Sequence, residues 1–380
     1  MKIFYWAPWI GNVGTIKAVL NSSFILSHYS KQKISTKIID AVGEWSSHSS
    51  SGKDNFINLS KFKVYKFLPQ GGYLKSRFTF IMIFIFSFLP LLRLIKKQRP
   101  NFLIVQLITS LPIFLSILFN LDTKIILRIS GFPKMNMFRK ILWRIASKKI
   151  HKVTFPSKDL YEQFTKLKIF DESKMNVLYD PILKYREISH LKYKKDLPDN
   201  LLNEKYLLAI GRLTKQKNFE FLIKNFKEIS KKYKQFKLVI IGEGELEQKL
   251  KKQIKLFKLE EKVLLLGFQK NVYKFLKNAE VFILTSLWEE IGFVLVEASS
   301  CDVNIISSDC KNGPKEFLRN GLGGYLFKNN NSREFLEKFN TFVNENNFER
   351  KTKKILAKKE SKKFSFLYHY KTFIKILDFI

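Results

Sequence analysis

Two glutamates, Glu289 and Glu297, lie eight positions apart in this 380-residue chain. Of all the spacings in the sequence, theirs most suggests a binding or catalytic site. An apolar run typical of a strand, residues 281–285, precedes them, and Gly292 stands between them. A strand, a glycine turn and a helix start in this order place backbone N–H groups at a helix N-terminus, where they attract an anion. One carboxylate would lie in the loop and the other one to two turns into the helix. Two solvated glutamates on an ordinary helix are the alternative interpretation.

Two basic residues follow another expected strand. Arg212 and Lys217 come directly after the apolar run 206–210. Open α/β sheets bind their ligands at the carboxyl ends of the strands. A guanidinium and an ammonium at that edge can neutralise a diphosphate without a metal ion. Because the chain is rich in lysine, an ordinary surface cluster is the alternative.

The elements that must position these residues form two series of alternating strands and helices. The first series has expected strands at 2–5, 36–39, 101–107, 124–129 and 151–155, and the second has them at 206–210, 237–241, 263–266, 281–285 and 303–307. Such alternation is typical of a parallel, doubly wound sheet. We therefore expect two α/β domains, at 1–184 and 204–361. The residues between them are densely charged, contain Pro198 and are expected to form a linker.

A glycine loop follows the first expected strand. Gly11 and Gly14 permit a tight turn and a close approach of the backbone to a bound group, although a plain turn has the same pattern.

Composition restricts the partners and the compartment. The formal net charge is +35, which implies anionic partners: phosphates, anionic lipid or nucleic acid. The two cysteines have no metal-ligand spacing, so a reducing compartment is expected, and the N-terminus does not read as a signal peptide. Two apolar stretches, 78–92 and 100–121, are candidates for a membrane span. Pro90 interrupts the first, while Ser110 and Pro112 divide the second into a strand and a helix start, so a true span is the less favoured alternative.

The charge of the first half is uneven. Between Asn55 and Lys158 the sequence has nineteen lysines and arginines and one carboxylate, Asp122. In the expected helix 137–149, one side carries the apolar residues 138, 141, 142 and 145, and the opposite side carries Lys140 and Arg144. This pattern is compatible with a solvated helix packed on a core and equally with a surface for anionic lipid.

The order of the motifs carries a family resemblance. They are Gly211-Arg212…Lys217, Gly242-Glu-Gly244, Gly267-Phe268, Glu289…Glu297-Ala298 and Ser308-Asp309-Cys310…Gly313-Pro314…Glu316. Over residues 205–327 this order resembles the retaining glycosyltransferases of family 4, which have the GT-B architecture of two Rossmann-like domains that face each other across a cleft. The N-terminal half resembles the family more loosely, through Gly11, Gly14 and the run from Arg128 through Gly131 to Lys134. Asp302 stands where the family usually has a glycine, and we expect this departure to alter packing only.

The resemblance implies a role for each candidate residue. Arg212, Lys217 and Gly11 would hold the diphosphate of the donor. Glu289, with the backbone at Gly292, Phe293 and Val294, would contact the transferred sugar, and Glu297 would bind the ribose. Gly267 and Phe268 would lie beside the base. On the acceptor side the candidates are Gly14, Arg128, Gly131 and Lys134, and a plain surface role is the alternative for Arg128 and Lys134. Chains of this type also end in a helix, here 362–380, that packs back on the first domain.

The resemblance implies an enzyme that moves a sugar, with retention, from a nucleotide sugar (a UDP-sugar is favoured) to a saccharide acceptor. The acceptor is expected to be lipid-linked, as in synthesis of bacterial surface polysaccharide or lipopolysaccharide. The enzyme would need no metal or other cofactor and would lie in the cytoplasm against the inner face of the cell membrane. A transferase for a soluble acceptor is one alternative. A polyanion- or nucleic-acid-binding protein is another, although the sequence has no clustered aromatic and basic recognition motif.

Overall fold

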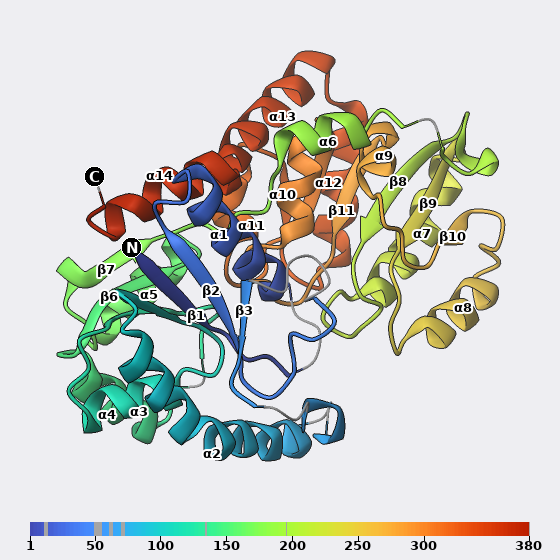
Figure 1. Ribbon diagram of the computed structural model, residues 1–380. Coiled ribbons are helices and arrows are strands. Elements are labelled where there is room, and N and C mark those ends of the chain that lie inside the picture. The colour runs from blue at the N-terminus through green and yellow to red at the C-terminus, as the bar shows by residue number, and fades with distance from the viewer. Residues whose placement is uncertain are drawn as a thin grey trace. The chain divides into compact units, whose positions relative to one another are not determined.

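The chain forms two compact units. The computed structural model describes residues 1–10, 14–48, 55–60, 64–69, 73–133, 135–194 and 196–379 (Figure 1). Unit 1 comprises Met1–Pro181 and Phe366–Ile380, and unit 2 comprises Ile182–Ser365. The two segments that join the units run beside each other, since the N–H groups of Ile182 and Leu183 both donate to the carbonyl of Phe364.

Unit 1 is built on a seven-stranded parallel sheet with the order β3-β2-β1-β4-β5-β6-β7. The strands are β1 (Lys2–Trp6), β2 (Ser35–Asp40), β3 (Phe56–Asn58), β4 (Phe102–Val105), β5 (Lys124–Arg128), β6 (Ile150–Phe155) and β7 (Met175–Val177). Successive residues of a strand point to opposite faces. Ile3 and Tyr5 therefore enter one core and Phe4 and Trp6 the other.

Helices cover both faces of this sheet. One face carries α1 (Thr15–Tyr29) and α14 (Phe366–Ile376), which pack together. The other carries α2 (Tyr73–Gln98), α3 (Ser110–Leu118), α4 (Met137–Ala146) and α5 (Lys158–Leu167). The final helix belongs to unit 1, where His369 Nδ1 donates to the carbonyl of Tyr179 at 2.8 Å and Nε2 of the neutral ring accepts from the Ser22 hydroxyl of α1 at 2.9 Å.

The structure corrects the reading of Pro90 as an interruption. Pro90 lies inside α2, which continues for eight residues beyond it because Leu91 and Ile95 are buried in the core. Tertiary packing here outweighs the intrinsic preference against proline. The part of α2 from Ser76 to Gln98 is long and apolar enough, by length and composition, to cross a membrane, and about a third of it is buried inside unit 1. A core helix of a water-soluble domain can meet the same criteria.

Unit 2 repeats the architecture with six parallel strands in the order β10-β9-β8-β11-β12-β13. They are β8 (Lys205–Ile210), β9 (Phe236–Ile241), β10 (Val263–Leu265), β11 (Val281–Leu284), β12 (Asn304–Ser308) and β13 (Tyr325–Phe327). The helices are α6 (Tyr185–Leu191), α7 (Phe219–Lys232), α8 (Glu247–Leu256), α9 (Tyr273–Asn278), α10 (Phe293–Ser300), α11 (Pro314–Phe317), α12 (Ser332–Asn344) and α13 (Asn347–Ser361). The prediction of two doubly wound α/β domains is confirmed.

The expected linker at 184–203 is not an extended connection. It contains α6 and belongs to unit 2, where Ile188 is buried and the side chain of Asn271 donates to the carbonyl of Leu191 at 3.0 Å. A helix of seven residues with one buried side chain is too short to leave a periodic pattern in the sequence.

Candidate active site at the carboxyl edge of the second sheet

The predicted site residues of unit 2 gather where the strand order reverses. β8 lies between β9 and β11, so the chain runs outward from β8 in both directions, and ligands bind beyond the carboxyl ends of the strands at such a point (Figure 1). The loop after β8 is tied to the loop after β11. The N–H of Leu287 donates to the carbonyl of Gln216 at 2.8 Å, and the Thr285 hydroxyl donates to the carbonyl of Lys217 at 2.9 Å.

Lys217 and Glu289 form an ion pair between these two loops. The Lys217 ammonium donates to Glu289 Oε1, and the Ser286 hydroxyl donates to the same oxygen at 2.6 Å. The side chains are 13% and 7% exposed, so water screens the pair poorly. The sequence placed both residues at this edge but did not predict that they would contact each other. Ser286 was missed, although a polar residue immediately after a buried strand was the available signal.

Arg212 supplies a second cation at the same edge. Its side chain is exposed and makes no ion pair with any residue that the structure describes. The backbone next to Arg212 is held by the loop after β9, since the N–H of Leu213 donates to the carbonyl of Glu243 at 2.8 Å. Gly242 is required at this contact, because a Cβ there would lie 1.9 Å from the Gly211 carbonyl oxygen. An anion that reaches this edge therefore meets one cation that is available and another that is held by Glu289.

The N-terminus of α10 lies beside Glu289, since a Cβ on Gly292 would lie 3.7 Å from the Glu289 carboxyl carbon. Gly292 caps the helix with φ +79°, a left-handed conformation that favours glycine, and the N–H groups of Phe293 and Val294 belong to the first turn. The turn is supported by Gly313, where a Cβ would lie 2.3 Å from the carbonyl oxygen of Glu290. The first turn of a helix attracts negative charge. The predicted strand–glycine–helix layout is therefore present.

Glu297 lies one turn into α10 and is 9% exposed. The Tyr273 hydroxyl donates to Glu297 Oε1 at 3.1 Å. Burial raises the pKa of Tyr273, and the Glu297 carboxylate raises it further, so this phenol stays a donor. Tyr273 was not predicted from the sequence, because nothing in its own segment marks it. The alternative of two solvated glutamates is wrong, since both Glu289 and Glu297 are buried.

Gly267 and Phe268 lie beside the Gly242–Gly244 turn. The N–H of Gly242 donates to the carbonyl of Gly267 at 2.8 Å, and the N–H of Phe268 donates to Glu243 Oε1 at 3.3 Å. The Phe268 ring is 71% exposed, which leaves an aromatic face open to a planar group.

The cysteine of the motif after β12 is not a reactive thiol. Burial raises the pKa of Cys310 to about 12, and the nearby Glu289 carboxylate contributes to the shift. Within the described ranges of the chain, no group of three or more His, Cys, Asp or Glu side chains is placed to hold a metal ion.

The candidate residues of unit 1 are placed less favourably. Arg128 ends β5, is 5% exposed, donates to the carbonyl of Leu178 at 2.9 Å and pairs with Asp180. The surface role considered for Arg128 is therefore wrong, and a direct phosphate contact would require this pair to open. Gly131 has φ +71°, so the turn after β5 uses its left-handed conformation. Gly14 is the exposed N-cap of α1 with φ −57°, which any residue can adopt. Gly11 and Lys134 lie outside the described residues.

Two doubly wound units with this anion-attracting edge define a GT-B-type architecture. Solved structures of similar fold include Anabaena HepE in complex with UDP, with a TM-score of 0.73, 14% identity and full coverage of both chains. Another is a glycosyltransferase from Rickettsia africae, with a TM-score of 0.75 and 16% identity over 99% of this chain and 98% of that chain. At these identities the similarity shows the fold alone.

The sequence comparisons match part of the chain to a family. Residues 194–359 match the family of glycosyl transferases group 1, so the chain contains a glycosyltransferase group 1 domain, which lies within unit 2. An uncharacterized glycosyltransferase of Methanocaldococcus jannaschii is 33% identical over 246 residues, which span 60% of either chain. A 4-alpha-N-acetylgalactosaminyltransferase of Campylobacter jejuni, named for a diphospho-undecaprenol-linked acceptor, is 28% identical over 275 residues, 70% of either chain.

Proposed function

We propose that this chain is an enzyme that transfers a sugar from a nucleotide sugar to a saccharide acceptor, with retention of configuration at the anomeric carbon. The observation that carries the proposal is the assembly of Arg212, Lys217 and Glu289 at the carboxyl ends of β8 and β11, inside the group 1 domain. A UDP-sugar is the favoured donor, and the UDP and UDP-glucose complexes of HepE, which shares the fold, support this choice.

The chemistry follows from the leaving group. The bond between the anomeric carbon and the phosphate oxygen breaks, so negative charge develops on the nucleoside diphosphate. Fixed cations and helix-end N–H groups that face this charge lower the barrier. In this chain they are the Arg212 guanidinium, the Lys217 ammonium and the N-terminus of α10. The acceptor oxygen bonds to the same face of the carbon, and its proton passes to the departing phosphate oxygen.

The ion pair gives Lys217 and Glu289 linked roles. A diphosphate that contacts Lys217 competes with Glu289 for its ammonium, and Glu289 is then available to accept hydrogen bonds from the hydroxyls of the sugar. Glu297, held by Tyr273, would accept from the ribose hydroxyls. The donor site would thus consist of protein cations and carboxylates, and we propose that turnover needs no metal ion.

The proposed acceptor is a lipid-linked saccharide, and the enzyme would work at the inner face of the cell membrane in surface-polysaccharide synthesis. Two Campylobacter relatives are named for undecaprenol-diphosphate acceptors, and the second of them is 25% identical over 85% of either chain. The nineteen basic residues between Asn55 and Lys158 suit the anionic surface in which such an acceptor lies.

A panel of nucleotide sugars tests the proposal. We expect UDP-sugars to raise the melting temperature of the chain, and the best of them to be consumed when a lipid-diphosphate-linked saccharide is added. The product should keep the anomeric configuration of the donor by NMR, and EDTA should leave the rate unchanged. An inverted product contradicts retention, and loss of all turnover in EDTA contradicts the metal-free site. Absence of both stabilisation and transfer across the panel contradicts the proposal as a whole.

A further inference from the structure

The helices α2, α3 and α4 of unit 1 form one layer. All three contribute to the same core on one face of the sheet, and α3 packs on both of its neighbours (Figure 1). The ring of Phe114 on α3 lies 6.1 Å from Phe84 and 6.4 Å from Phe88 of α2, measured between centroids. The sides of these helices that face away from the sheet therefore belong to one surface.

The outer side of α2 is apolar. Phe78, Ile81, Ile85 and Leu89 recur every three or four residues, which places them on one stripe of the helix. Each is at least 51% exposed, although the opposite side of the same helix is buried in the core. The stripe runs from Phe78 to Leu89, a length of roughly 17 Å at the rise of an α-helix. A helix of a water-soluble domain normally turns a polar side outward.

The outer side of α4 is also apolar, which reverses the arrangement expected for a helix packed on a core. Phe138, Ile141 and Ile145 are 75%, 50% and 54% exposed, while Trp143 and Ala146 are the buried residues of this helix. The amphipathic pattern in the sequence is real, but most of its apolar side faces away from the protein.

The neighbouring helix α5 provides an internal comparison. It packs on the same face of the sheet and buries Leu160 and Phe164, while Glu162 and Lys166 are exposed. An apolar outer side is therefore not shared by every helix on this face of the sheet.

Basic side chains border the apolar stripes. Arg93, Lys96 and Lys97 are exposed at the end of α2, and Lys140 and Arg144 are exposed on α4. Burial lowers the pKa of Arg139 on α4, and the Arg77 guanidinium of α2 lowers it further, so the two helices bring positive charge together. A helix with an apolar side and a basic border is the type that lies in the interface of an anionic membrane.

We propose that the outer sides of α2, α3 and α4 form a membrane-docking surface whose apolar side chains enter the headgroup region of an anionic bilayer. This inference rests on the proposed function for its biological setting and adds to it a specific surface and an apolar mode of binding. Charge alone would hold the chain at the membrane only at low salt. The apolar stripes add a contribution that salt does not screen, since it comes from removal of apolar surface from water.

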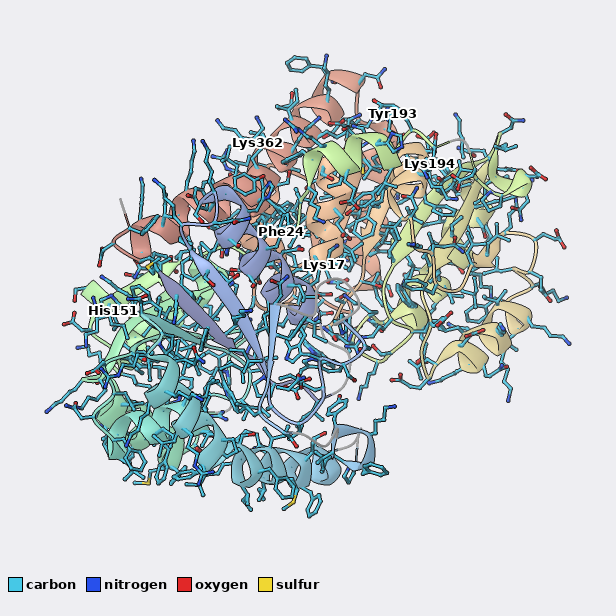
Figure 2. All side chains as sticks on the ribbon, viewed as in Figure 1. Lys17, Phe24, His151, Tyr193, Lys194 and Lys362 are labelled. Atoms are coloured by element: carbon cyan, nitrogen blue, oxygen red, sulfur yellow. The ribbon has the colours of Figure 1, made fainter. Side chains whose placement is uncertain are left out.

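Vesicle co-sedimentation with the full chain tests this proposal. The apolar variant is F138S/I141S/I145S, and the basic variant is K140Q/R144Q. The matched control is Phe24→Ser, which removes an aromatic ring of 51% exposure from α1 on the opposite face of the sheet; Figure 2 shows Phe24 and Lys17 on that helix. All variants change exposed side chains, and circular dichroism and melting temperature should match the wild type.

With vesicles of phosphatidylglycerol in phosphatidylcholine, the apolar variant should bind about tenfold more weakly at low salt and lose the binding that the wild type retains at ~1 M salt. The basic variant should lose affinity at low salt only, and Phe24→Ser should bind as the wild type does. Binding by the apolar variant equal to that of the control overturns the proposal. A second result would also overturn it. If the wild type is a dimer that does not bind vesicles, and the apolar variant is a monomer, the surface joins two copies of the chain.

UDP binding, measured in parallel, separates this inference from the proposed function. UDP binding without vesicle binding overturns the docking surface and leaves the donor site intact. Vesicle binding that depends on α4, without binding of any nucleotide, overturns the proposed function and supports the docking surface.

Discussion

The buried ion pair between Lys217 and Glu289 allows its structural and ligand-binding roles to be measured separately. We consider Lys217→Met, Glu289→Gln and the double variant. Removal of one partner of a buried pair costs about 3–5 kcal/mol, because the other charge is left unpaired. Lys217 is 13% exposed and Glu289 keeps its bond from Ser286, so we expect the lower end, about 3 kcal/mol for each single variant. For a unit of this size that lowers the melting temperature by about 6–12 °C.

The double variant should cost less than the sum of the single variants, because no charge is left alone. UDP affinity should follow a different pattern. Lys217→Met removes a charge-assisted contact of about 1.5–3 kcal/mol, which weakens binding roughly 10- to 150-fold. Glu289→Gln removes the competitor for the ammonium, so UDP, which has no sugar to contact Glu289, should bind as tightly as before or more tightly.

Calorimetric titration with UDP and thermal unfolding of the four proteins provide the assay. Lys215→Met, an exposed lysine on the same loop, is the matched control and should change neither quantity. If Glu289→Gln weakens UDP binding as much as Lys217→Met does, the pair only maintains the fold and the reasoning is refuted.

Three further predictions concern other described contacts. Glu297→Ala should raise the KM for the donor more than it lowers kcat, in steady-state kinetics, because ribose contacts are lost. Unchanged kinetics would show that Glu297 does not contact the donor and serves only the packing of unit 2. His369 is buried and its pKa is lowered to about 3, so the stability it contributes is present above pH 6.5 and is lost as the pH falls from 6.5 toward 3. At pH 5 this loss amounts to about 2 kcal/mol, and His369→Gln should lose less stability than the wild type between pH 7.5 and pH 5 in urea unfolding; equal losses contradict the assignment. Asp302 has φ +63° and pairs with Lys358 at 2.8 Å, a partly exposed contact, so Asp302→Gly should be near neutral in thermal unfolding while Asp302→Ala should be less stable than Asp302→Gly by about 1 kcal/mol; similar large losses in both variants would show that the ion pair, which both remove, dominates.

Apolar runs and turn residues predicted most of the fold. Each expected strand forms, with its ends shifted by a residue or two. The strands β3, β7 and β13 were missed because each has only three residues at the edge of a sheet. The edge strand β10 is as short, but it lies in the wholly apolar run 263–266, which the sequence shows. Pro90 and the expected linker were misinterpreted for another reason. In both segments, packing against the rest of the unit outweighs the local preference for a break or an extended chain.

The site was predicted in its position but not in its contacts. Lys217 and Glu289 lie 72 residues apart in the chain, and only the adjacency of β8 and β11 brings them together. The outward apolar side of α4 was equally hidden, because a periodic pattern gives the two sides of a helix and does not say which side meets the core. Arg128 illustrates a third limit, since its partner Asp180 comes from a segment that the sequence did not connect with it.

The central claim is that the carboxyl edge of the unit 2 sheet binds the diphosphate of a nucleotide sugar. A crystal structure of the full chain with UDP tests it most directly. The account predicts a diphosphate within hydrogen-bond distance of Arg212 and Lys217, close to the first turn of α10, with the ribose hydroxyls on Glu297. A UDP molecule bound elsewhere on the chain, with the Lys217–Glu289 pair intact, would contradict it.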